Sequence, residues 1–195
     1  MSHYRKIALA VFAALTLTPA CALLKKPTPL TQLQVSLNAA ELQWPERLEL
    51  GGVKARGMLQ SDRMIVTNGA LVMQHAGLRW IAAPATQLTE QLAMASVSTS
   101  IPAAQKRSGK KAVIDVWLSD FNISVGANGD TSVAVSASAT VRCAPAKKVS
   151  QLTPSALVLP LNSTDPQRIA QTFNNAANKV LASLLMQGAE TSSKC

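Results

Sequence analysis

Alternating apolar and polar residues predict several strands in this chain, because successive side chains of a strand point to opposite faces. Leu33, Val35 and Leu37 alternate with polar neighbours, which indicates a half-buried strand near the start of the folded region. Short β-prone stretches follow over 53–59 and 64–67. We therefore expect a sheet that begins with these three segments.

A hairpin turn is predicted at Asn68-Gly69. This dipeptide lies between two β-prone stretches and favours a two-residue turn, whose backbone needs positive φ angles. Gly77 is expected to break the second strand of the hairpin, just before Arg79 and Trp80.

A second hairpin is predicted from two long strands over 112–125 and 131–143, joined by a turn at 126–130 (GANGD). The second of these strands has an unbroken apolar row on one side, formed by Val133, Val135, Ala137, Ala139, Val141 and Cys143. A shift of one residue would expose the whole row, so the pairing register is well specified.

Two helices are predicted from their start signals and their apolar periodicity. The first covers 84–97 and begins with a proline. For the second, Asp165 is the expected N-cap, Pro166 suits the first position and Gly188 suits the far end. Its apolar stripe recurs at intervals of three and four residues and comprises Ile169, Phe173, Ala176, Ala177, Val180, Leu181, Leu184 and Leu185.

The order of these elements predicts a single α+β domain over 32–188, followed by a C-terminal tail over 189–195. We expect a mostly antiparallel sheet with the two helices packed on one face. An apolar content of 48% is high enough for such a core and excludes disorder as the main state. No apolar run approaches the roughly 18 residues that a membrane-spanning helix needs, which excludes a polytopic membrane protein.

The N-terminal residues 1–20 have the pattern of an export signal. Arg5 and Lys6 form a short basic region, residues 7–17 (IALAVFAALTL) are apolar, and the small residue Ala20 precedes Cys21. We therefore interpret 1–20 as a signal peptide and expect the protein to leave the cytoplasm.

Two processing sites are open at the end of this signal. A small residue directly before a cysteine resembles a lipobox, in which Cys21 is acylated and becomes the new N-terminus. Residues 21–31 would then be a lipidated cysteine and a Pro/Lys tether with a reach of roughly 30 Å. The non-acidic Ala22 resembles sorting signals for the outer membrane. The alternative is ordinary cleavage after Ala22, and Pro19, which departs from the lipobox pattern, keeps it open.

Cysteine parity leaves Cys143 and Cys195 as one pair once Cys21 is acylated or removed with the signal. An exported protein lies where disulfides persist, so we expect a bridge that pins the C-terminal tail to the core. The alternative is two free thiols.

The formal net charge of +9 favours association with anionic surfaces. Four cations gather in the loop over 102–111, namely Lys106, Arg107, Lys110 and Lys111, and they are candidate contacts for anionic lipid or an acidic protein face. The alternative is a solvated loop. Nucleic acid is not an expected partner, since no aromatic residue is interleaved with these cations and the signal exports the chain.

No arrangement of catalytic or metal-binding residues is recognisable in the sequence. His75, the one histidine beyond the signal, lies in a predicted strand and is interpreted as a tolerated strand residue. Asp115 and Asp120 lie five residues apart on an expected strand and should face opposite sides, which disfavours a paired-carboxylate site. We therefore expect no enzyme activity, no catalytic residue, no metal and no cofactor.

Several stretches together resemble the ABC-type transport auxiliary lipoproteins, the family that includes the paraquat-inducible outer-membrane lipoprotein of Mce-type lipid transport systems. They are 62–66 (DRMIV), 77–80 (GLRW), the helix that starts at Pro84, the strand that reaches Phe121 and the alanine-rich last helix. The likeness spans about residues 30–187.

The resemblance implies a periplasmic domain held at the outer membrane through acyl chains on Cys21. Its implied partner is the MCE-domain periplasmic component of an ABC transporter of lipids, with a ring of identical subunits as one arrangement. At the junction of strand and helix, Arg79 and Trp80 are candidate contacts with a partner or with lipid, and plain packing of Trp80 is the alternative. The rival interpretation of the chain is a soluble secreted basic binding protein or inhibitor without a lipid anchor.

Overall fold

The computed structural model describes residues 29–98, 112–144 and 148–195. The predicted acylation site, Cys21, and the four loop cations, Lys106, Arg107, Lys110 and Lys111, lie outside the described residues. What we inferred about them from the sequence stays a prediction. Within the described ranges, no helix combines the length and the apolar character needed to cross a membrane.

Eight strands of the described chain form one mixed, mostly antiparallel sheet. They are β1 (Thr31–Leu33), β2 (Leu48–Ala55), β3 (Arg63–Asn68), β4 (Leu71–Trp80), β5 (Ala112–Val125), β6 (Thr131–Cys143), β7 (Lys148–Gln151) and β8 (Ser155–Pro160).

The long strands β5 and β6 are the centre of the sheet and pair antiparallel from end to end. β2 and β3 share the other edge of β5 and both run parallel to it, β2 along its first half and β3 near its end. β7 and β8 share the other edge of β6 in the same way, both antiparallel. β4 lies beyond β3, and β1 completes that end. The two central strands therefore tie together shorter strands at both ends of the sheet.

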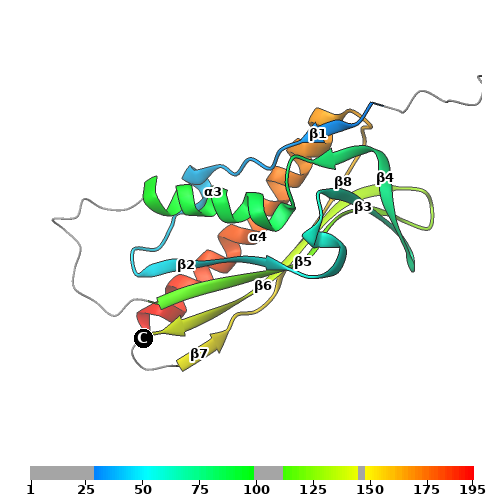
Figure 1. Ribbon diagram of the computed structural model, residues 1–195. Helices are drawn as coiled ribbons and strands as arrows, with labels where there is room; N and C mark the ends of the chain where they lie inside the picture. The colour runs from blue at the N-terminus through cyan, green and yellow to red at the C-terminus, as the bar shows by residue number, and fades with distance from the viewer. Residues whose placement is uncertain (1–28, 99–111, 145–147) are drawn as a thin grey trace, which may run out of the picture.

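The helices α3 (Pro84–Ser98) and α4 (Pro166–Ser193) cover one face of the sheet (Figure 1). α4 begins as predicted, because the side chain of Asp165 accepts a hydrogen bond of 3.2 Å from the N–H of Gln167. Two shorter segments, α2 (Ala39–Leu42) and the 3₁₀ turn η1 (Gly57–Gln60), lie in the connections. The predicted α+β domain, with helices packed on a mostly antiparallel sheet, is confirmed.

Three aromatic rings form the centre of the core between helices and sheet. Trp80 of β4, Phe121 of β5 and Phe173 of α4 are completely buried. The ring centroids lie 5.2 Å apart for Trp80 and Phe121, 5.0 Å for Trp80 and Phe173, and 4.8 Å for the two phenylalanines. The predicted apolar row of β6 and the stripe of α4 are buried around them. Aromatic pairs at these distances add to the stabilisation that comes from burial alone.

The last helix continues past Gly188, so the predicted helix end at this residue is wrong. Gly188 is buried where α4 lies against the sheet. A Cβ atom at this position would lie 3.0 Å from Cδ2 of Leu48 and 3.3 Å from Cδ1 of Ile114. The glycine thus permits close packing of the helix on the sheet and does not end the helix.

β4 also continues through Gly77, so the predicted break of this strand is wrong. A β-bulge instead displaces the residues between Gln74 and Arg79 from the ladder with β3. The Nδ1 atom of His75 accepts hydrogen bonds from the N–H groups of Gly77 and Leu78, each 3.1 Å long. The imidazole therefore satisfies backbone donors that the bulge removes from the ladder.

Strands β7 and β8 and helix α2 are not among the predicted elements, and the first strand lies earlier than predicted. β1 ends at Leu33, and Val35 is buried in the irregular segment that follows. Its N–H donates to Oε1 of Gln87 in α3 at 2.8 Å, a side-chain bond that replaces the missing strand pairing. The predicted alternation of buried and exposed residues is present, although the strand itself is not.

Candidate functional site

The face of the sheet opposite α3 and α4, here called the outer face, carries polar and partly exposed side chains. On β6 this second row consists of Ser132, Ala134, Ser136, Ser138, Thr140 and Arg142. In the described part of the chain no helix packs over this row (Figure 1). The outer face is therefore left open to contact with another molecule in the described part of the chain.

A buried carboxylate, that of Asp115 on β5, organises this face. Its side chain is 8% exposed and is paired with Arg142 of β6 and Lys54 of β2. Arg142 donates a hydrogen bond from Nε at 3.0 Å, and its Nη2 atom lies 2.7 Å from the same carboxylate oxygen. Lys54 donates from Nζ at 3.3 Å. Gly51 makes room for this carboxylate, because a Cβ atom there would lie 2.6 Å from its Oδ1 atom. The geometry serves to hold two cations at fixed positions.

The indole ring of Trp117, which lies on β5 like Asp115, is close to two cations, Lys54 and Arg56. Lys54 Nζ is 5.3 Å from the ring centroid, and the guanidinium carbon of Arg56 is 5.1 Å from it. Both distances are within the range of cation–π attraction. We call Lys54, Arg56, Arg142 and Trp117, together with Asp115 beneath them, the basic patch.

The basic patch has chemistry for binding an acidic group. It contains three positive charges and one negative charge, and the cationic side chains of Lys54 and Arg142 are 50% and 56% exposed. Guanidinium groups match the geometry of carboxylates and phosphates. The exposed cationic groups of the patch are therefore suited to recognition of an anionic surface.

Asp115 and Asp120 lie on the same face of the sheet, so the prediction that they point to opposite faces is wrong. Asp115 pairs with Thr140 and Asp120 with Ser136, and these two residues of β6 belong to one row. The cause is a β-bulge in β5 between Leu118 and Asp120, which inserts an extra residue and inverts the alternation. Their partners are four positions apart along β6, so the two carboxylates are roughly 13 Å apart.

Trp80 and Arg79, the candidate contacts at the strand–helix junction, differ in exposure. Trp80 is completely buried in the aromatic core, which is the packing position that the sequence left open. Arg79 is 34% exposed, and its Nη1 atom lies 3.7 Å from Oδ2 of Asp62. Among the described residues, neither Nε1 of Trp80 nor Nε of Arg79 has a hydrogen-bond partner. The guanidinium group is thus partly accessible from outside the domain, whereas the indole is not.

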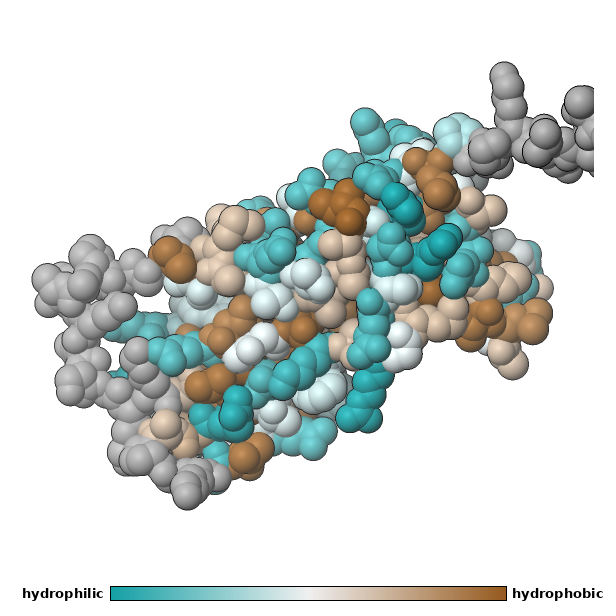
Figure 2. Space-filling view, in the orientation of Figure 1, coloured by the Kyte–Doolittle hydropathy of each residue, from teal (hydrophilic) through white to brown (hydrophobic). Residues whose placement is uncertain are grey.

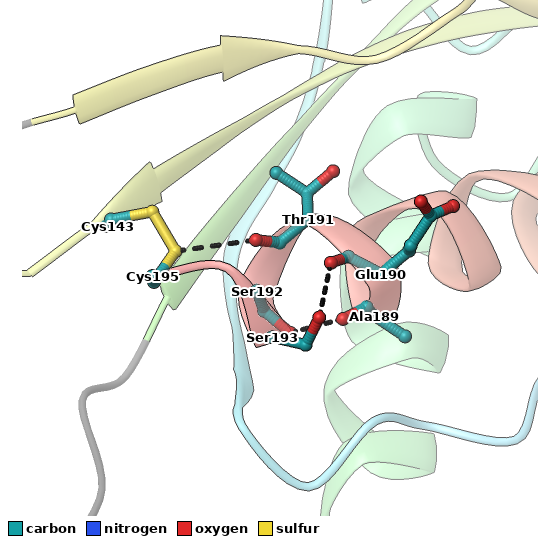
Figure 3. Close-up of a disulfide and its surroundings, with 7 residues drawn as sticks. All are labelled: Cys143, Ala189, Glu190, Thr191, Ser192, Ser193 and Cys195. Atoms are coloured by element: carbon teal, nitrogen blue, oxygen red, sulfur yellow. Dashed lines mark hydrogen bonds between the residues drawn. A yellow bond between two sulfur atoms is a disulfide. The ribbon is translucent and has the colours of Figure 1, made fainter.

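The predicted bridge between Cys143 and Cys195 is present (Figure 3). The two Cα atoms are 5.4 Å apart, and the cysteines are separated by 52 positions in the sequence. Because α4 ends at Ser193, the bridge ties the end of this helix to the end of β6. The C-terminus is thereby fixed at the end of the sheet that also carries Arg142.

The basic patch was not predicted from the sequence. Its residues come from β2, β5 and β6, and only the register of these strands brings them together. The signal that was available is an aspartate inside a β-prone stretch, since a charge on a strand needs a partner when it is buried. The predicted loop cations lie outside the described residues.

No protein-family model and no curated protein matches this sequence. Among solved structures, the chain is similar to the crystal structure of protein XCC0632 from Xanthomonas campestris, described as family DUF330, with a TM-score of 0.65 and 19% identity. That match covers 84% of this chain and 99% of the other. The structure of an uncharacterized protein matches with a TM-score of 0.57 and 12% identity, over 84% of this chain and 98% of the other. At these identities the likenesses establish the fold alone.

Proposed function

We propose that this chain is an outer-membrane lipoprotein that serves as the auxiliary, scaffolding component of an ABC transport system for lipids of the Mce type. The observation that carries the proposal is the N-terminal sequence, in which an export signal ends at Cys21 and a Pro/Lys tether leads into the folded domain. The resemblance of 62–66 and 77–80 to the auxiliary lipoproteins supports it. The structural likeness to a DUF330 protein supports it at the level of the fold.

In this role the protein contributes position and no chemistry. Acyl chains on Cys21 hold one end at the membrane, and the tether sets a reach of roughly 30 Å. The folded domain then presents a rigid surface within that reach. Its core of packed aromatic rings and its disulfide keep that surface in one shape.

The basic patch is the part of the outer face best suited to the partner. We assign it to an acidic surface of the MCE-domain periplasmic component. The buried Asp115 holds Arg142 and Lys54 in place before binding, so little side-chain freedom is lost when the partner docks. Complementary charge also speeds the encounter and fixes the register of the complex.

Affinity purification from the native host tests this function. The tagged full chain is extracted from membranes with detergent, and the proteins bound to it are identified by mass spectrometry. The proposal expects an MCE-domain protein and its ABC transporter subunits. A mature protein that stays soluble in the periplasm and purifies with no membrane complex would refute it and would favour the soluble binding protein.

A further inference from the structure

The hairpin of β3 and β4 exposes large apolar side chains at its tip. Leu71, Val72 and Met73 are 64%, 53% and 46% exposed. Successive residues of β4 point to opposite faces, so Val72 lies on one face of the hairpin and its two neighbours lie on the other. The tip is therefore apolar on both faces, and a core that packs on one side of the sheet does not explain this.

No charged residue occurs in the tip, residues 68–74 (NGALVMQ). Exposed apolar patches mark contacts with proteins or with membranes. Two further apolar residues, Leu30 and Ile81, are 46% and 49% exposed. Leu30 directly precedes β1, and Ile81 directly follows β4. The uncharged composition fits a lipid layer better than the polar rim of a protein interface.

The hairpin lies at the end of the molecule where the N-terminal segment leaves the domain. Figure 1 shows the turn between β3 and β4 at that end, with the C-terminus at the other. Figure 2 shows apolar surface at the same end of the molecule. Only residues 22–30 separate β1 from Cys21, the predicted acylation site. An anchored domain thus turns this end toward the membrane.

We propose that the tip of the hairpin, residues 68–74, inserts into the lipid layer to which Cys21 anchors the protein. This inference rests on the proposed function, because it takes the acyl anchor as given. Insertion adds a second point of attachment and so converts a domain swinging on a tether into one with a defined orientation. Arg142, at the end of β6 joined to the C-terminus through the disulfide, then faces away from the membrane and toward the periplasmic partner.

Depth-dependent quenching of tryptophan fluorescence tests the insertion. Val72→Trp places an indole at the tip, and Val149→Trp is the matched control, because Val149 is 60% exposed on β7 at the opposite end of the sheet. The acylated full chain is reconstituted in vesicles of neutral phosphatidylcholine, with or without bromine on the acyl chains. The emission of the native chain is subtracted from both variants.

The proposal expects the added emission of Val72→Trp to shift to the blue in vesicles and to be largely lost with brominated chains, while that of Val149→Trp changes in neither way. If brominated acyl chains reduce the added emission of Val72→Trp no more than that of Val149→Trp, the insertion is overturned. A blue shift of Val72→Trp without dependence on bromine would also overturn it, since the tip would then be buried against a second protein molecule. Intact mass separates the two proposals: a chain without acyl groups refutes both, whereas an acylated chain with an unquenched tip refutes only the insertion.

Discussion

Replacing Gly51 with alanine should destabilise the domain through the buried carboxylate of Asp115. The new Cβ atom would lie 2.6 Å from Oδ1 of Asp115 and 3.0 Å from Cγ1 of Val113. A carbon atom cannot approach an oxygen so closely, so the carboxylate must move. Movement in this confined position takes it away from the two cations that it holds.

The size of the loss follows from the bonds that this movement breaks. Asp115 accepts charge-assisted hydrogen bonds from Nε of Arg142 at 3.0 Å and from Nζ of Lys54 at 3.3 Å, and Nη2 of Arg142 lies 2.7 Å from it. Such bonds contribute about 1.5–3 kcal/mol each. Both cations are about half exposed, so solvent screening reduces their contribution. We expect the free energy of unfolding to fall by about 2–3 kcal/mol.

Urea unfolding of the disulfide-bonded protein, followed by circular dichroism, measures this change. Gly77→Ala is the control, because a Cβ atom there meets no other atom within 4 Å and no positive φ is required. Its unfolding free energy should stay within about 0.5 kcal/mol of that of the native chain. If Gly51→Ala is as stable as Gly77→Ala, the carboxylate does not depend on the space that Gly51 leaves, and the reasoning is refuted.

Three further predictions concern the core, the disulfide and the basic patch. Cys195→Ser should lower the unfolding free energy by about 2–4 kcal/mol, because the bridge closes a long loop; an unchanged urea midpoint would contradict this. Trp80→Ala should cost about 3–5 kcal/mol and Trp117→Ala clearly less, since only the first indole is fully buried; equal losses in urea unfolding would count against the proposed core. Arg56→Glu should weaken co-purification of the membrane partner while leaving stability almost unchanged. Lys148→Glu, which makes the same change of charge outside the patch, should weaken co-purification less. Equal effects of the two variants would show that the patch is not part of the docking surface.

The sequence predicts those parts of the fold that local patterns determine. The alternation along β6 identifies its buried row, and Asp165 with Pro166 identifies the start of α4. Each of these two signals consists of residues that are close together in the sequence. The disulfide is predicted for a different reason, since an exported chain with Cys21 set aside has only one pair left.

The errors occur where long-range packing overrides a local signal. Gly188 has the residue type of a helix end, but its function is to let α4 approach Leu48 closely. The bulge near Asp120 inverts the alternation of β5 and has no signal in the sequence. The basic patch was missed for the same reason, because Lys54 and Arg142 meet Asp115 only through the pairing of strands far apart in the chain.

The intact mass of the mature protein from its native host tests the central claim most directly. The account predicts a polypeptide that begins at Cys21 and carries acyl groups, and a gain of two daltons on reduction of the bridge between Cys143 and Cys195. A bare polypeptide that begins at Leu23 would contradict it. The protein would then lack an anchor, and the basic patch would belong to a soluble secreted binding protein.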